Sequence, residues 1–394
     1  NLTFLLFKVI QWKMPLSRRR VIYLAATVGG AAVIVAATGG SLYLSGNMNE
    51  PTTTTRKITT KTSTQQINPK SYPKNAYLDG EKSLVSVVQG TGNQEDIPKM
   101  VRRSVELLGG LEKIDVNGRS VLVKPNTNSN NAHPASTNPL VVGTIVEMLF
   151  EAGAAKVTVG DSSNINNKTS EVMRDQGIMK AVEDAGGEVM FLEDEEYTTV
   201  QIPGGKWLTE TRISKPIYEA ERLINVPVVK SHNVTNYTMS MKNFVGTIHR
   251  DSRFDPEWKP TTKVFHACGN PAEAAAELSI LVNPDLVIMD GTKSLVSYGE
   301  SDDSGEVRNT NLIIASGDRI ANDIVGLSII KSYGIWPEVV DKEVWDQPTI
   351  KRAQELSLGR DKEEIRIIGE SLAGETKIDE LMQTIYDLTG VSRL

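Results

Sequence analysis

"NPLVVGTIVEMLFEAGAAKVTVGD", residues 138 to 161, contains the pattern that decides the fold class. Its first part predicts a helix, with Asn138 as N-cap, Pro139 at the first helical position and Gly153 just past the end. Its last six residues, "KVTVGD", are short, apolar and rich in valine, which predicts a strand. A helix that leads directly into a buried strand is typical of a parallel α/β sheet.

The same alternation recurs on both sides of this stretch. Further strands are predicted at "SLVSVVQG" (83–90), "SVLVKPN" (120–126), "ERLINVPVVKSH" (221–232), "PDLVIMDG" (284–291) and "NLIIASGD" (311–318), and further helices at 96–108, 270–282 and 319–334. The strands are apolar without strict alternation, as in sheets that are covered on both faces. We therefore expect an α/β fold with a mostly parallel sheet and helices on both faces, in one large domain or two lobes.

The amino end predicts an export signal. The chain does not begin with methionine, and we place the true start at Met14. The sequence from Ser17 to Ile22, "SRRRVI", resembles a twin-arginine signal. The uncharged stretch from Val21 to Leu44 would extend about 36 Å as a helix, which is enough to cross a membrane. An ordinary signal anchor is the alternative.

These features divide the chain into three parts. Residues 1–46 form the signal or anchor, residues 47–76 a flexible Thr-rich linker, and residues 77–394 the α/β domain. The expected location is extracytoplasmic, by the twin-arginine export machinery, with the protein either anchored in the membrane or secreted.

Composition excludes several classes of function. Residues 1–50 hold five of the 43 basic side chains and one of the 49 acidic ones, so the remainder has 38 basic, 48 acidic and a net charge of −10. Such an acidic body argues against nucleic acid as a partner. Cys268 is the single cysteine, so one chain cannot build a cysteine-ligated iron–sulfur cluster. No Walker loop, dinucleotide loop or Gly-x-Ser-x-Gly elbow is present.

Polar side chains follow the predicted strands at the edge where α/β sheets bind ligands. They are Lys124 and Asn126, Asp161, Lys230 and His232, Asp290, and Asp318. Turns alone do not require two lysines and a histidine. The sequence therefore predicts a site at these strand ends for a small anionic ligand, a carboxylate or a phosphate ester.

Each of these residues has a functional and a structural interpretation. His232 could be a general acid or base, or could simply bond a backbone carbonyl. Lys124, Lys230 and Lys242 could hold an anion as point charges, or could pair with Asp161 or Asp290. Asn243 could orient the ligand or cap a helix.

A metal site is a further hypothesis. Asp161, Asp290, His232 and His266 are the candidate ligands, with Mg, Mn or Fe as the metal that this donor set favours. Capping by Asp161 and a turn at Asp290 are the alternatives. Cys268 is expected to be a buried structural thiol.

Five blocks of the sequence resemble the domain of unknown function 362 family. They are "VLVKPN", the stretch from Ser136 to Ser163, "INVPVVKSHNVTNYTMSMKNFVG", "NPDLVIMDG" and "SGDRIANDIVG", and together they span about residues 80 to 330. The resemblance implies an α/β fold, frequent twin-arginine signals and, in many members, an iron–sulfur ferredoxin module. This chain departs from the last feature, because it has only Cys268.

A fainter similarity links "SHNVTNYTMSMKNFVG" to the nickel-pincer lactate racemase family. In that family the histidine is an acid/base and the lysine holds the pincer cofactor, which would fall on His232 and Lys242. The second histidine expected after "KVTVGDSS" is missing. The predicted function is therefore an exported, membrane-tethered enzyme, isomerase- or racemase-like or an oxidoreductase. The alternatives are a non-catalytic binding module of the envelope for an anion or metal complex, and a redox protein with a non-cysteine cofactor.

Overall fold

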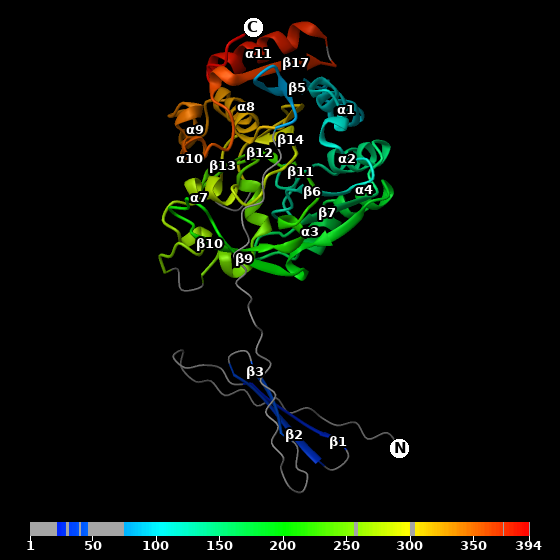
Figure 1. The fold of residues 1–394 in the computed structure, drawn as a ribbon, viewed down its shortest axis with the longest axis vertical. Coiled ribbons are helices and arrows are strands. Elements are labelled where there is room, and N and C mark those ends of the chain that lie inside the picture. The colour runs from blue at the N-terminus through cyan, green and yellow to red at the C-terminus, as the bar shows by residue number, and fades with distance from the viewer. Residues whose placement is uncertain are drawn as a thin grey trace. The chain divides into compact units, whose positions relative to one another are not determined.

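The computed structural model describes residues 22–28, 31–38, 41–45, 75–255, 259–299, 304–372 and 374–393. The chain divides into two compact units, Asn1–Thr62 and Ser63–Leu394. The two units are described separately below (Figure 1).

The described part of the first unit is a three-stranded antiparallel sheet in the order β1-β2-β3. Its strands are β1 (Ile22–Val28), β2 (Ala31–Thr38) and β3 (Ser41–Ser45). The helix predicted from Val21 to Leu44 is therefore wrong. Val, Ile, Thr and Tyr in this run favour strands, and two Gly-Gly pairs divide it into strand lengths.

The described residues contain no other candidate for the predicted membrane helix. None of their helices is both long enough and apolar enough to cross a bilayer. The arginines of the export motif, Arg18 to Arg20, lie outside the described residues.

The second unit is built on a twelve-stranded sheet whose main path runs β17-β5-β16-β14-β11-β6-β7-β8. The bounds of these strands are β5 (Lys82–Gln89), β6 (Ser120–Pro125), β7 (Lys156–Asp161), β8 (Glu188–Phe191), β11 (Arg222–Val226), β14 (Leu286–Leu295), β16 (Leu312–Ser316) and β17 (Ile365–Ser371). Only β16 runs against its neighbours on this path. The prediction of a mostly parallel α/β sheet is confirmed.

Short strands extend or accompany this path. They are β4 (Leu78–Asp79), β12 (Val228–His232), β13 (Asn236–Thr238) and β15 (Val307–Arg308), while β9 (Tyr197–Gln201) and β10 (Glu210–Ser214) form a separate ribbon. The helices are α1 (Ile97–Leu108), α2 (Pro139–Glu151), α3 (Thr169–Asp175), α4 (Ile178–Asp184), α5 (Lys215–Tyr218), α6 (Arg250–Arg253), α7 (Pro271–Leu278), α8 (Arg319–Ser332), α9 (Pro337–Val340), α10 (Pro348–Glu355) and α11 (Glu375–Thr389).

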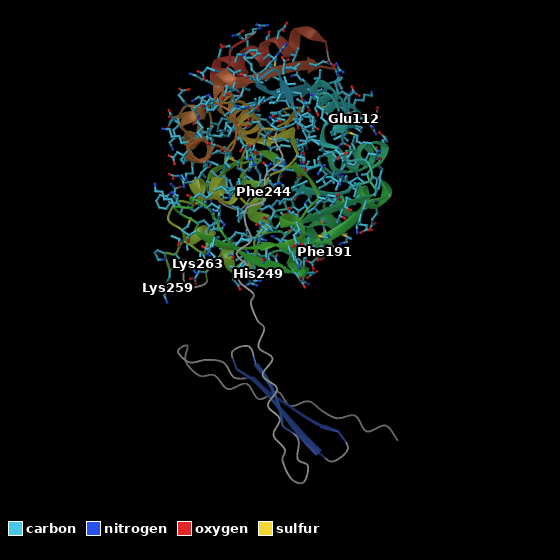
Figure 2. The ribbon with its side chains drawn as sticks, in the orientation of Figure 1. Glu112, Phe191, Phe244, His249, Lys259 and Lys263 are labelled. Atoms are coloured by element: carbon cyan, nitrogen blue, oxygen red, sulfur yellow. The ribbon has the colours of Figure 1, made fainter. Side chains whose placement is uncertain are left out.

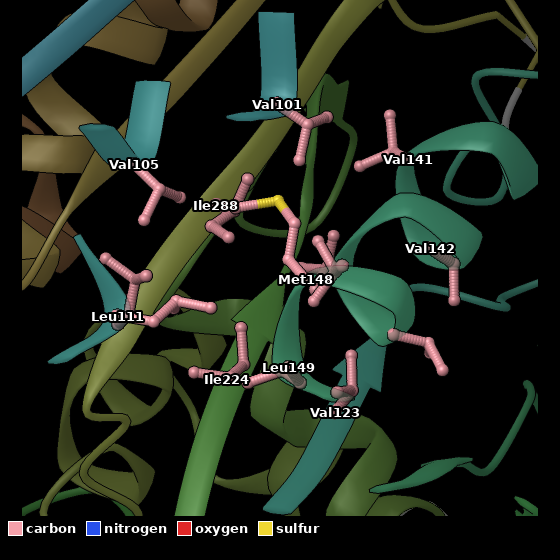
Figure 3. Close-up of a cluster of buried hydrophobic side chains, with 14 of the residues drawn as sticks. Val101, Val105, Leu111, Val123, Val141, Val142, Met148, Leu149, Ile224 and Ile288 are labelled. Carbon is pink, nitrogen blue, oxygen red and sulfur yellow. The ribbon is translucent and has the colours of Figure 1, made fainter. Parts of the chain in front are cut away.

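Helices cover both faces of the sheet (Figure 1). On one face α1 and α2 pack on apolar side chains of the central strands, among them Val123, Ile224 and Ile288 (Figure 3). On the other face α8 and α11 pack on alternate residues of the same sheet, among them Val229 and Met289. Burial of this apolar area is the dominant stabilising term of the fold.

The first helix of the deciding stretch begins as predicted. Asn138 accepts the N–H of Leu140 at 3.0 Å, Pro139 takes the first helical position, and Gly153 follows the end of α2 with a φ of +89°. That left-handed conformation is easy only for glycine.

One predicted strand is two. Pro227 separates β11 from β12, because proline has no N–H for the ladder. Its carbonyl accepts the N–H of Asp290 at 2.8 Å, and β12 then continues alongside β14 beyond that point. This break carries Lys230 and His232 past the ends of β6 and β7, over the edge where the site lies.

Candidate functional site

A cavity of about 410 Å³ lies at the carboxyl ends of β6 and β7, beside β12. The described side chains that line it include four cations, Lys124, Lys230, Lys242 and Arg253, and a single carboxylate, Asp161. Two of the four histidines of the chain, His232 and His266, also line it. The structure thus brings together most of the residues predicted from the strand ends.

Lys124 and Asp161 form a buried ion pair at the floor of the cavity. Lys124 Nζ lies 2.6 Å from Asp161 Oδ1 and 2.9 Å from the Pro125 carbonyl, and both side chains are almost fully buried. Asp161 Oδ2 accepts the N–H and the hydroxyl of Thr127. Burial lowers the pKa of Lys124, and the Asp161 carboxylate opposes that shift.

Lys230, a predicted ligand-binding residue on β12, is held by the segment between β6 and α2. Its Nζ donates to Asn126 Oδ1 at 3.1 Å and to the Ala135 carbonyl at 2.9 Å. Lys230 is 1% exposed, so its charge acts in a poorly solvated environment.

A chain of buried amides links these two lysines. Asn126 Nδ2 donates to Asn243 Oδ1 at 3.0 Å, and Asn243 Nδ2 donates to Asn225 Oδ1 at 2.8 Å. Asn225 in turn donates to the Ser240 carbonyl. All the bonds run in one direction, so each amide is fixed by the next. Asn243 therefore lies inside the wall of the cavity and does not cap a helix.

Lys242 and Asn243 belong to a 3₁₀ segment, Lys242–Thr247. Phe244, labelled in Figure 2, is fully buried in an apolar cluster below the segment and anchors it. A Cβ placed on Gly246 would lie 3.2 Å from Lys124 Nζ and closer still to Asp161. Only glycine lets this segment approach the ion pair so closely.

Arg253 was not predicted as a site residue. All its N–H groups are used: Nε donates to the Ile248 carbonyl, and the terminal nitrogens donate to Ser162, Ser163 and Gly246. These acceptors are all uncharged. Arg253 therefore joins two walls of the cavity and contributes positive potential, but its hydrogen bonds are committed to the protein.

His232 sits where β12 turns into β13. Its Nδ1 accepts the backbone N–H of Val234 at 3.0 Å, and its ring lies 5.5 Å from that of Tyr298. Burial lowers the pKa of His232 well below its usual value, and the charges of Lys242 and Lys230 lower it further. His232 is therefore a neutral imidazole at neutral pH.

His266 supplies a second imidazole. It stacks on Phe254 with ring centroids 4.3 Å apart, and it makes no hydrogen bond to any residue that the structure describes. Burial, with the charges of Lys242 and Arg253, lowers its pKa to about 3. Both histidines were predicted as candidate metal ligands; here they lie in the same cavity, with His266 on a short 3₁₀ turn, Phe265–Ala267.

Thr238 is another residue that sequence reasoning missed. It pairs with Lys230 across the β12–β13 hairpin, so both side chains lie on the same face. It is 3% exposed, lines the cavity, and its hydroxyl has no hydrogen-bond partner in the described part of the chain. A buried polar group of this kind is rare and points to a functional environment.

Two predicted ligand-binding residues lie away from the cavity. Asp290 is buried on β14, where it accepts the N–H of Asn138 at 2.8 Å and both donors of Thr292. Asp318 caps α8 through Ala321 and also binds Ser83 and the N–H of Arg360.

The position of Asp318 follows from strand direction. Because β16 is antiparallel to β14, its carboxyl end lies at the other edge of the sheet. That edge has a larger cavity of about 830 Å³, lined by residues of both charges. The expectation that Asp318 joins the same edge as Lys124 is therefore wrong.

The metal hypothesis gains no geometric support. Asp161 is bonded to Lys124 and Thr127, and Asp290 to α2, so the four proposed ligands do not converge. Within the described ranges no group of three or more His, Cys, Asp or Glu is arranged to hold a metal ion. Cys268 is buried, as expected, and burial raises its thiol pKa to about 11.

A buried acid lies behind the 3₁₀ segment. Asp323 on α8 is fully buried and accepts the N–H of Ser240 at 2.8 Å and that of Met241 at 3.4 Å. Burial raises its pKa to about 7, while the hydrogen bonds from Ser240 and Met241 and the charge of Arg319 act against that rise. Asp323 thus holds the backbone that leads into Lys242.

Known proteins resemble this chain at several levels. A thylakoid-associated protein of Synechocystis sp. is 28% identical over 239 residues, which cover 59% of this chain and 69% of that protein. A crystal structure of a Thermotoga maritima protein matches with a TM-score of 0.33 and 14% identity, over 57% of this chain and 55% of that one. The lactate racemase apoprotein of Thermoanaerobacterium thermosaccharolyticum matches with a TM-score of 0.37 and 9% identity, over 80% and 88%.

Neither structural likeness is close enough to support a statement about function. The family comparison is more specific, since a family described as a domain of unknown function, DUF362, matches residues 121–328. That range is more than half of the chain and contains every cavity residue named above. The resemblance inferred from the sequence blocks is confirmed: this chain belongs to the DUF362 family.

Proposed function

We propose that this protein is an enzyme that binds a small anionic ligand, a carboxylate or a phosphate ester, and transfers a proton to or from it. The composition of the cavity lining carries the proposal. Four cationic side chains and one carboxylate among the described lining residues create a positive potential, and three of the cations, Lys124, Lys230 and Arg253, are buried. Such a cavity favours anions over neutral molecules of the same size.

The remaining lining limits the kind of anion. Ile165, Val245 and Phe254 give the cavity an apolar side, and its volume of about 410 Å³ suits a small organic molecule. A ligand with an anionic end and a short carbon body matches both parts. Lys124 and Arg253 act on it through their field, because their hydrogen bonds go to the protein.

Lys242 provides the direct test of anion binding. Replacing Lys242→Gln should weaken the binding of small anions by about tenfold or more, because one charge is lost from a cavity with low screening. The same change should raise the pKa of His266, since Lys242 is the main charge that lowers it. Calorimetric titration with acetate, pyruvate, malonate and inorganic phosphate measures the first effect, and NMR titration of the imidazole signals measures the second.

The matched control is Lys180→Gln. Lys180 is highly exposed and pairs with Asp184 on the surface of α4, so its loss should leave anion affinity unchanged. If none of the anions binds the wild-type protein, or if both lysine variants behave alike, the proposal is wrong.

Proton transfer is supported by the two imidazoles beside these cations. Both imidazoles are neutral at neutral pH. An anion in the cavity would offset the fields of Lys242 and Lys230 and so raise the pKa values of the two imidazoles. Exchange of carbon-bound hydrogen for deuterium in a bound acid, followed by NMR, measures this step. An anion that binds without exchange or turnover would instead favour the non-catalytic binding module. A chromophore in the purified protein would favour the redox alternative.

We also propose that the protein is exported and associates with a membrane. The twin-arginine pattern at Ser17 to Ile22 supports this, and so does the name of the thylakoid-associated relative. Replacing Arg18→Lys together with Arg19→Lys should retain the full chain in the cytoplasm of a bacterial host, whereas Arg20→Lys, at the variable position, should not. Cell fractionation decides, and equal export of both variants would contradict the twin-arginine route.

A further inference from the structure

The hydrogen bond to His232 Nδ1 fixes which nitrogen of the ring carries the proton. A neutral imidazole has one N–H and one nitrogen with a lone pair. The backbone N–H of Val234 donates to Nδ1 at 3.0 Å, so Nδ1 must present its lone pair. The proton of the neutral ring is therefore on Nε2.

The local backbone keeps this arrangement in place. His232 and Asn236 are paired at the end of the β12–β13 hairpin, and Val234 lies in the turn between them. Asn236 has a φ of +66°, a left-handed conformation that asparagine tolerates. The bond from Val234 thus forms within the hairpin itself and does not depend on a distant element.

The surroundings of His232 also keep the ring neutral. The groups that face it are the ammonium groups of Lys230 on its own strand and Lys242 on the 3₁₀ segment, and the imidazole of His266. The ring of Tyr298 packs beside it. Positive neighbours and burial disfavour an imidazolium, and no carboxylate is among the groups that act on this ring in the described structure.

We propose that His232 acts on the ligand as a hydrogen-bond donor through Nε2–H and not as the base. The inference rests on the proposed function and refines it, because it states what the ligand must offer at this point: an oxygen that accepts a hydrogen bond. A carboxylate, carbonyl or phosphate oxygen meets that requirement, and an ammonium group does not. A neutral imidazole donor stabilises negative charge that develops on such an oxygen.

The assignment separates the roles of the two histidines. His232 has one lone pair, and Val234 occupies it, so the ring cannot take up a proton without breaking that bond. His266 makes no hydrogen bond to a described residue, so a lone pair of its ring remains available to accept a proton. The ligand is then expected to place an acceptor oxygen at His232.

The tautomer can be measured without any ligand. Long-range ¹H–¹⁵N correlation spectra of the imidazole groups at neutral pH should show His232 with a protonated Nε2 and an unprotonated Nδ1. With only four histidines in the chain, the signals are assigned by their loss in the His232→Gln variant. The opposite tautomer, or an imidazolium, would overturn the inference whether or not the anion proposal holds.

Two variants test the donor role. The amide nitrogen of glutamine lies as many bonds from Cα as Nε2, and that of asparagine as many as Nδ1. His232→Gln should therefore keep anion affinity within about threefold, whereas His232→Asn should lose about tenfold or more. The probe is whichever of pyruvate, malonate and inorganic phosphate binds the wild-type protein.

The outcomes separate the two proposals. Equal losses in both variants would reject the donor role while anion binding by the wild type stands. If no probe binds, the proposed function fails and the tautomer measurement alone decides the assignment of His232. Far-ultraviolet circular dichroism and the melting temperature of both variants check that the hairpin has folded.

Discussion

Replacing Asp161 by alanine should lower the free energy of unfolding by about 3–5 kcal/mol. The change removes the carboxylate that lies 2.6 Å from Lys124 Nζ and leaves a buried ammonium group without its counter-charge. It also removes the acceptor of the Thr127 N–H and hydroxyl, which are buried too. Each of these groups then bears a desolvation cost that water no longer offsets.

Urea denaturation of the wild type and the variant measures this loss. The control is Asp184→Ala, which breaks the exposed pair of Asp184 with Lys180 and should cost no more than about 0.5 kcal/mol. The double change Asp161→Leu with Lys124→Met should recover much of the loss, because no buried charge remains. A cost near that of the control would show that the pair is solvated and that the cavity floor is not as described.

The Lys124–Asp161 pair can be replaced without much loss of stability, but we expect it to be needed for anion binding. A Leu and Met pair would fill the floor, but Lys124 Nζ would no longer bond Asn243 or the Pro125 carbonyl. The chain of amides from Asn126 to Asn225 would lose one of its anchors. We therefore expect the double variant to be stable and to bind anions poorly.

Local sequence signals were sufficient for most of the sheet. The strand and helix around Gly153 were predicted because capping residues and β-branched runs act over a few residues. Parallel strands place their carboxyl ends at one edge, so Lys124, Asp161 and Lys230 could be expected together before any contact was known.

Other features depend on pairing that short patterns do not record. The direction of β16 decides where Asp318 lies, and an apolar strand has the same sequence pattern in either direction. Arg253 ends the four-residue helix α6 and His266 lies in a short 3₁₀ turn, where neither periodicity nor a strand end marks them as cavity residues. The run from Ile22 to Ser45 has the apolarity of a membrane helix, and its strand character lies only in its β-branched residues and Gly pairs.

The second large effect concerns Asp323. Its pKa is raised from 3.8 to about 7, so the folded protein holds a proton that the unfolded chain releases from about pH 4 upward. The unfolded state then binds fewer protons than the folded state, and the free energy of unfolding falls as pH rises. The contribution is fully present below about pH 4, declines between about pH 4 and pH 7, and is lost above about pH 7.

Asp323→Asn should remove this dependence. Between about pH 5 and about pH 8 the variant should gain about 3 kcal/mol relative to the wild type, since each pKa unit is worth about 1.4 kcal/mol. Urea denaturation of both proteins at a series of pH values gives the difference, in which the titration of all other groups cancels. The control is Asp184→Asn, which removes an exposed carboxylate.

The sign of the Asp323 effect also bears on the site. Charging Asp323 above pH 7 strengthens its bonds to the Ser240 and Met241 N–H groups and is favoured by the charge of Arg319, while burial opposes the charge. The protein thus loses global stability as the backbone before Lys242 becomes more firmly held.

In Asp323→Asn the amide can accept one of these N–H groups but presents a donor to the other, so Lys242 should be less well fixed. We therefore expect this variant to be more stable than the wild type at pH 8 and to bind anions more weakly. A variant that gained stability and kept full affinity would show that Asp323 does not position the segment.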